Sequence, residues 1–78
     1  MRTNREIVES IIEELNWSWE YNNKEHKKQR VIMNSTSGIE ELEDLNRRAT
    51  EDCDYHYKKA IEATNKITAL KEAIKLMI

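Results

Sequence analysis

The sequence contains no proline and only one glycine, Gly38. Proline breaks helices and glycine weakens them, so their scarcity leaves long stretches of the chain free to be helical. A sharp turn usually needs one of these two residue types. The chain therefore has essentially one place for such a turn, next to Gly38.

The single cysteine, Cys53, excludes a disulfide within the chain. The sequence also lacks a signal peptide and any apolar run near 18 residues, so we expect a soluble, cytoplasmic protein with no membrane partner. A net charge of −2 gives no overall attraction to nucleic acid. The 78 residues predict one small domain, residues 1–78, whose core alone rarely supplies more than about 3–5 kcal/mol.

The stretch from Gly38 to Ile78 carries the strongest pattern. Apolar or small residues recur at alternating steps of three and four from Ile39 to Met77. This is the heptad period of helices that pack side by side, and it predicts one helix over about 38–78. An isolated helix of this kind is not stable in water, so it needs partners. A competing interpretation breaks the helix near residues 50–54, which the unbroken heptad pattern argues against.

The first part of the chain predicts a second helix over about 4–32. Thr3 and Glu6 have the spacing of a capping box at its start. One face is apolar as far as Trp19 and then becomes polar, and Asn22–Asn23 is its weakest point. Residues 33–37 form the predicted loop, and Ser37 with Glu40 predicts a second capping box.

A short loop between two helices implies that they lie antiparallel. We therefore predict an all-α antiparallel helical hairpin with a long C-terminal helix. Folding about Ser35–Thr36 pairs residues whose numbers sum to about 71. That register sets the basic segment 24–30 beside the acidic segment 40–54, so the charges there are expected to pair internally.

The predicted helices differ in length, which leaves the end of the second one uncovered. An exposed apolar surface of this kind marks an association site. We therefore predict a homo-oligomeric bundle, with an interface formed by Ile67, Leu70, Ile74, Met77 and Ile78. The alternative is that a broken second helix folds back and buries these residues within one chain. Small residues on the seam (Ala49, Ala60 and Ala63) predict a close approach of the helices.

Aromatic and basic side chains suggest a partner-binding surface. The candidates are Trp17, Tyr21, Tyr55, Tyr57 and Lys58. Tryptophan and tyrosine beside cationic residues are typical of interface hot spots. The same rings could equally pack against another copy of the chain.

No arrangement of residues predicts an enzyme, and we expect no cofactor or metal. Cys53 and His56 lie three residues apart beside Asp52, but a zinc site needs a further pair of ligands. The predicted register places His26 nearer Leu45 than Cys53. A small core cysteine is the simpler interpretation.

Three functions fit these patterns. The first is a non-enzymatic interaction protein (a regulator, inhibitor or assembly factor) that acts as a homo-oligomer and binds a protein partner. The second is an oligomer that holds a small anion or nucleotide between protomers, near Trp17, Tyr55, Tyr57, Lys58 and Lys59. The third, a nucleic-acid binder that uses Lys24 to Arg30, is less favoured because this basic segment is short and lacks interleaved aromatic residues.

Overall fold

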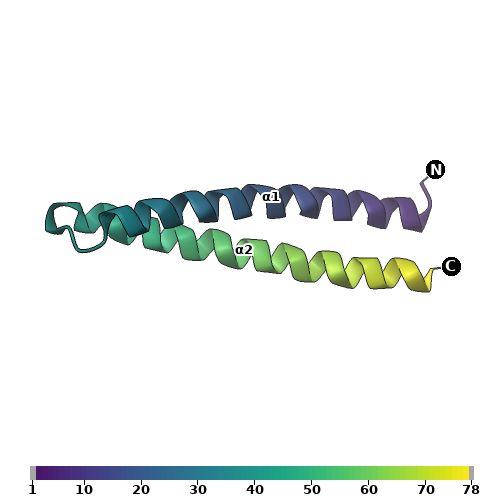
Figure 1. Ribbon diagram of the computed structural model, residues 1–78. Helices are drawn as coiled ribbons and strands as arrows, with labels where there is room; N and C mark the ends of the chain where they lie inside the picture. Colours follow the sequence, from purple (N-terminus) through teal and green to yellow (C-terminus); the bar gives the residue numbers. More distant parts are fainter. Residues whose placement is uncertain (1, 78) are drawn as a thin grey trace.

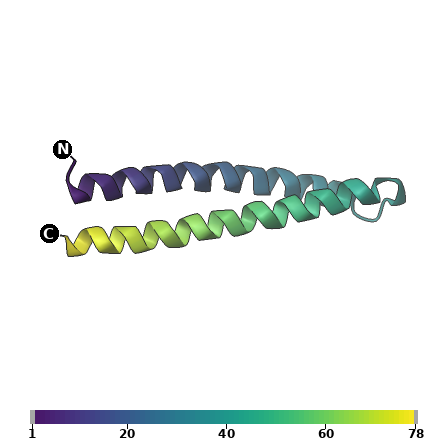
Figure 2. The same cartoon turned by 180° about the vertical axis from the view of Figure 1, so that it is seen from behind.

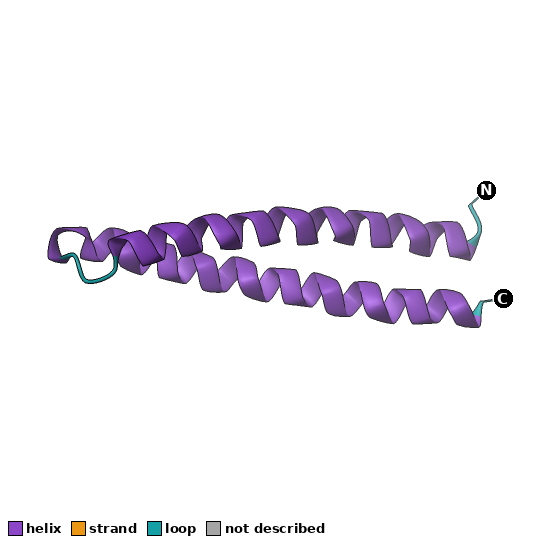
Figure 3. Cartoon of the chain, in the orientation of Figure 1, coloured by secondary structure: helices purple, strands orange, loops and turns teal. Residues whose placement is uncertain are grey.

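The computed structural model describes residues 2–77 and consists of two long helices joined by a short connection (Figure 1). Helix α1 spans Asn4–Thr36, a 3₁₀ turn η1 spans Glu40–Leu42, and α2 spans Glu43–Leu76. The all-α prediction is confirmed, because the described part of the chain contains no strand (Figure 3). The molecule is a rod with extents of 58 × 20 × 13 Å.

The two helices lie side by side and run in opposite directions, with both termini at one end (Figures 1 and 2). This arrangement fits the expected helical hairpin. Helix α2 continues without interruption through residues 50–54, so the three-helix alternative is wrong. Helix α1 likewise continues through Asn22–Asn23.

Helix α1 begins as the sequence predicts but ends four residues later. The Thr3 hydroxyl accepts a hydrogen bond from the Glu6 amide at 3.2 Å, which makes Thr3 the N-cap. At the other end, the Ser35 and Thr36 hydroxyls donate to the carbonyls of Val31 and Ile32, at 2.7 and 2.8 Å. Each hydroxyl bonds back by four residues along the helix, so these residues continue α1 instead of forming the predicted loop.

The chain reverses at Gly38, the only described residue with a positive φ, at 77°. Backbone bonds from the Ile39 amide to the Thr36 carbonyl and from the Leu42 amide to the Ile39 carbonyl close the connection. The predicted capping box of Ser37 and Glu40 is wrong. The N-cap positions of η1 and α2 are Ile39 and Leu42, and neither side chain makes a capping hydrogen bond.

Replacing Gly38 by alanine tests this turn. We expect Gly38→Ala to lower the free energy of unfolding by about 1–2 kcal/mol, because a side chain disfavours the left-handed backbone conformation. No neighbouring atom lies within 4 Å of the added carbon, so the loss would come from the backbone alone. Urea unfolding followed by circular dichroism measures it. Gly38→Asn should lose less, since asparagine tolerates this conformation, and an unchanged Gly38→Ala variant would contradict the turn geometry.

The register between the helices differs from the prediction by about two helical turns. Bonded residues across the interface, such as His26 with Cys53 and Asn22 with His56, have numbers that sum to 79 and 78, not about 71. The reason is that the connection is centred near Gly38 and Ile39 rather than Ser35–Thr36. The helices are consequently of nearly equal length, 33 and 34 residues.

The predicted uncovered end of α2 is therefore wrong. Ile67, Leu70 and Ile74 are partly buried within the chain, and Ile67 lies in a hollow with Trp19 of α1. Leu76 and Met77 do remain exposed, whereas Ile78 lies outside the described residues. Most residues of the candidate interface therefore already pack in the seam within one chain.

The core of the hairpin is thin. Its buried apolar side chains are Ile12, Ala49, Cys53, Ala60 and Ala63. The three alanines lie on the seam, where small side chains allow the helices to approach closely. None of the described side chains is less than 2% exposed. Two helices alone cannot enclose their larger apolar residues, so many of these residues stay half exposed.

Candidate functional site: a polar seam between two aromatic faces

The half of the interface near the connection is held together by hydrogen bonds between side chains of α1 and α2. Nearest the turn, the Asn46 amide donates to the Met33 carbonyl at 2.8 Å and to the Thr36 hydroxyl at 3.0 Å. The Thr36 hydroxyl in turn donates a hydrogen bond to the Ile32 carbonyl. Each polar group is thus paired in the thin core, where an unpaired group would be costly.

A buried pair of His26 and Cys53 forms the next link, with 3.2 Å between Nδ1 and Sγ. The Arg30 guanidinium, which can only donate, lies 3.0 Å from His26 Nε2. His26 Nε2 is therefore the acceptor, so Nδ1 carries the hydrogen and donates a hydrogen bond to Cys53 Sγ. The Cys53 thiol in turn faces the His26 carbonyl at 3.6 Å. The predicted proximity of His26 to Leu45 is wrong.

Asn22 and His56 form the third link, with 2.7 Å between Oδ1 and Nδ1. The Asn22 Nδ2 group donates to the Ser18 carbonyl at 2.8 Å, which fixes the amide with its oxygen toward His56. His56 Nδ1 is then the donor. The three links together leave no buried side-chain nitrogen or oxygen unpaired in the described residues.

One face of the hairpin, which we call the tyrosine face, carries two tyrosine rings around His56. The Tyr21 and Tyr55 rings meet the imidazole edge-on, with centroid distances of 5.9 and 5.1 Å. The Lys59 ammonium lies 5.7 Å from the Tyr55 ring. Beside Lys59 is a small hollow of about 170 Å³, lined by Leu15, Ser18, Lys59, Glu62, Ala63 and Lys66.

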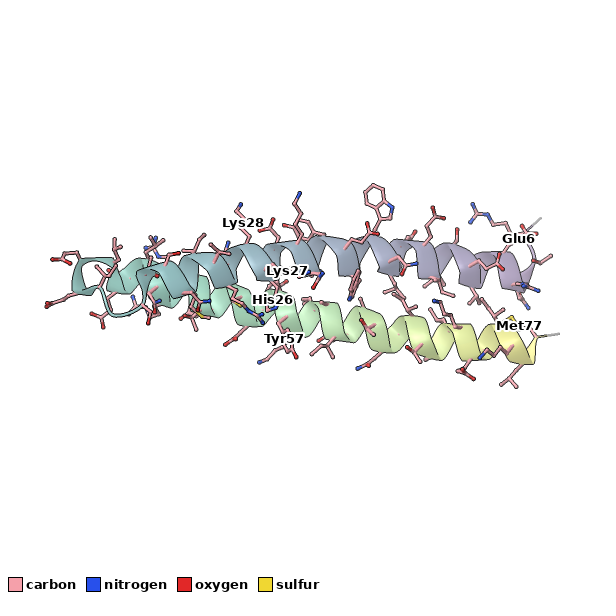
Figure 4. All side chains as sticks on the ribbon, in the orientation of Figure 1. Glu6, His26, Lys27, Lys28, Tyr57 and Met77 are labelled. Atoms are coloured by element: carbon pink, nitrogen blue, oxygen red, sulfur yellow. The ribbon has the colours of Figure 1, made fainter. Side chains whose placement is uncertain are left out.

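The opposite face is organised around Tyr57, whose ring lies 5.1 Å from that of His26 (Figure 4). Thr64 is seven residues after Tyr57 and shares its side of α2. Thr64 lines a hollow of about 330 Å³ together with Asn16, Trp19, Ile67, Thr68 and Lys71. Trp19, predicted to be in the core, is 38% exposed at this edge of the seam.

The five predicted partner-binding residues do not form a single surface within one chain. Tyr21 and Tyr55 meet at His56, whereas Tyr57 packs on His26 at the other face. Trp17 is 75% exposed and lies beside Ser10, Glu13 and Glu14 of its own helix. Lys58 is also exposed.

The basic segment 24–30 is not neutralised as predicted. The four ion pairs found among residues 2–77 all join residues three or four apart on one helix. The observed register sets 24–30 opposite about 49–55, which still carries Glu51, Asp52 and Asp54, but no ion pair joins the two segments in the described residues. Figure 4 shows Lys28 extending away from α2. The lysines of this segment are therefore exposed to solvent, whereas His26 within it is buried in the seam.

The seam offers little for chemistry on a substrate. Cys53 and His26 are a thiol and an imidazole in contact, but both are more than nine-tenths buried. His26 also donates to the sulfur and so is not placed to remove its proton. In the described part of the chain, no three histidine, cysteine or acidic side chains are grouped to hold a metal ion. The contact between His26 and Cys53 was not predicted from the sequence, because it depends on the register between the two helices.

The fold and the seam define a two-helix hairpin that is mostly apolar at its terminal end and polar near its connection. Comparison with known protein families, curated proteins and solved structures gives no match. Neither described helix contains a segment apolar enough to cross a membrane.

Proposed function

We propose that the protein is a non-enzymatic helical interaction protein that works as a homo-oligomer and binds a macromolecular partner. The observation that carries this proposal is its surface area. The chain exposes 6299 Å², whereas a compact monomer of 9.3 kDa exposes about 5,000 Å². The excess of about 1,300 Å² per chain is more than the roughly 800 Å² that each partner buries in a standard protein interface.

The exposed surface also has the composition of an association surface. Ile7, Ile11 and Met77 are each more than 40% exposed near the terminal end. Burial of such side chains contributes about 1.5–3 kcal/mol each when complete. Because a hairpin of this size has little core of its own, association supplies stability that a single chain lacks.

Two exposed aromatic residues outside the pair that defines the tyrosine face support a second, foreign partner. Trp17 and Tyr57 expose 75% and 50% of their surfaces. Large rigid rings of this kind often anchor protein interfaces. The polar seam then serves as a rigid support for these rings, since its hydrogen bonds fix how the two helices lie against each other.

Light scattering on the purified chain tests self-association. We expect a mass of at least twice that of one chain at micromolar concentration, because the exposed apolar side chains would leave water on association. A monomer at all concentrations, with intact helical circular dichroism, would contradict the proposal.

Partner binding is tested separately with Trp17→Ala. Immobilised wild-type protein should retain a discrete macromolecule, which is then purified and titrated directly, and the substitution should weaken that binding at least tenfold. The oligomeric mass should stay the same. Equal affinity of the wild type and the Trp17→Ala, Tyr57→Ala and Lys58→Ala variants would exclude these candidate residues.

A further inference from the structure

We propose that the tyrosine face is covered by a second copy of the chain, with the connections of both copies at one end. Helix α1 of each copy would lie along α2 of the other, giving a four-helix bundle. This inference rests on the proposed self-association and adds its surface and orientation.

The residues that line the hollow beside Lys59 identify which lengthwise rows of side chains form the tyrosine face. Ser18 and Lys66 line this hollow, and residues seven apart on a packed helix share one row. Ile11, Glu25 and Ile32 therefore share the Ser18 row, and Asp52, Lys59 and Ala73 share the Lys66 row. Arg48 and Ala69 share the row of Glu62, which also lines the hollow. Tyr21 defines a neighbouring row on α1 that also contains Ile7, Glu14 and Lys28.

These rows are complementary to each other when two copies meet with their connections together. The apolar ends match, because Ile7 and Ile11 of one copy face Ala73 and Ala69 of the other. The charges between them match as well. At the same heights along the rod, Glu14 faces Lys66 of the other copy, and Lys28 faces Asp52.

The reverse orientation, with the connections at opposite ends, fits the same rows poorly. It would place α2 against α2 and set Lys59 against Lys59 of the other copy. It would also set Ile11 opposite Lys28 and Ala69 opposite Arg48. Pairing like charges, and burying apolar side chains against cationic ones, disfavours that orientation.

The area that two copies would need to bury is in the range of a permanent dimer. A compact protein of twice this mass exposes about 8,200 Å², so two such hairpins would have to bury roughly 4,400 Å² to become equally compact. Obligate homodimer interfaces bury about 2,000–5,000 Å². Glu14 and Lys66 form no ion pair among residues 2–77, so both charges are free for the second copy.

Charge reversal tests the pairing. Glu14→Lys sets a cation against Lys66 of the other copy, and Lys66→Glu sets two acids together. Each variant alone should associate roughly tenfold more weakly than the wild type, because both symmetric contacts change. Mixing the two variants should restore wild-type affinity, since every contact in the mixed dimer again joins opposite charges. Glu13→Lys, one residue along and on a different row, should have no effect.

Orientation is tested by a distance between spin labels at Glu6→Cys, an exposed position at the terminal end (Figure 4). Cys53 is buried and should label poorly. Connections at one end predict a separation under about half of the 58 Å rod. The reverse orientation would set residue 6 opposite residue 33, about 40 Å away along the rod. A separation of about 40 Å or more, or no rescue on mixing, would overturn this arrangement while leaving self-association intact. A monomeric wild type would instead overturn the proposed function itself.

Discussion

Replacing Ile12 by alanine is expected to lower the free energy of unfolding by about 2–4 kcal/mol. Ile12 is the most deeply buried large aliphatic side chain of the described chain, at 9% exposure. The register places it opposite Ile67, between helices that pack closely through alanines. Removing its three outer carbons leaves a cavity that rigid helices fill poorly. Since a small core supplies about 3–5 kcal/mol, the variant would be only marginally folded.

Urea unfolding at a fixed protein concentration measures this loss, because association couples stability to concentration. Val31→Ala is the matched control. Val31 also lies on α1 but is 66% exposed, so its truncation should cost less than about half a kcal/mol. Equal losses for the two variants would show that the buried seam of α1 is assigned incorrectly.

The fold class and the ends of the hairpin near its termini follow from the sequence. The heptad pattern identifies the seam residues of both helices, and the buried alanines and Cys53 lie on it. Thr3 caps α1 as its local spacing predicts. These features depend on neighbours within one or two turns, which a sequence displays directly.

The register could not be predicted because it depends on a choice that the local sequence leaves open. Ser35 and Thr36 are common in loops, yet here their hydroxyls bond to carbonyls of the preceding turn and extend α1. Moving the turn by about four residues changes every cross-helix pair. The predicted uncovered end of α2 failed for this reason.

The candidate site was recognised in part. Asn22, His26, Asn46 and His56 were identifiable as polar seam positions, because they fall on the heptad pattern. Which of them bond to one another requires the register, and so does the contact of His26 with Cys53. The split of Tyr55 and Tyr57 between two faces follows from their spacing, since residues two apart on a helix point about 200° apart.

Replacing Asn22 by leucine is expected to cost about 1–3 kcal/mol of stability, although leucine is the more apolar residue. Asn22 is 7% exposed and accepts the proton of His56 Nδ1. Without that acceptor, the imidazole N–H faces an apolar side chain and loses its only described partner. His56→Leu should also destabilise the hairpin, because it leaves the Asn22 oxygen unpaired in the seam.

The double variant Asn22→Leu/His56→Leu should recover most of this loss, since neither helix then presents an unpaired polar group. Additive losses of stability in the double variant would show that the two side chains are not bonded across the interface.

Recovery of stability in the double variant has a consequence for structure as well. A polar pair at one heptad position favours a single register, because any slip separates donor from acceptor. The double variant should therefore be stable but less uniquely packed, with faster amide exchange in α2 around residue 56, and that combination would identify the polar seam as the feature that sets the register of the hairpin.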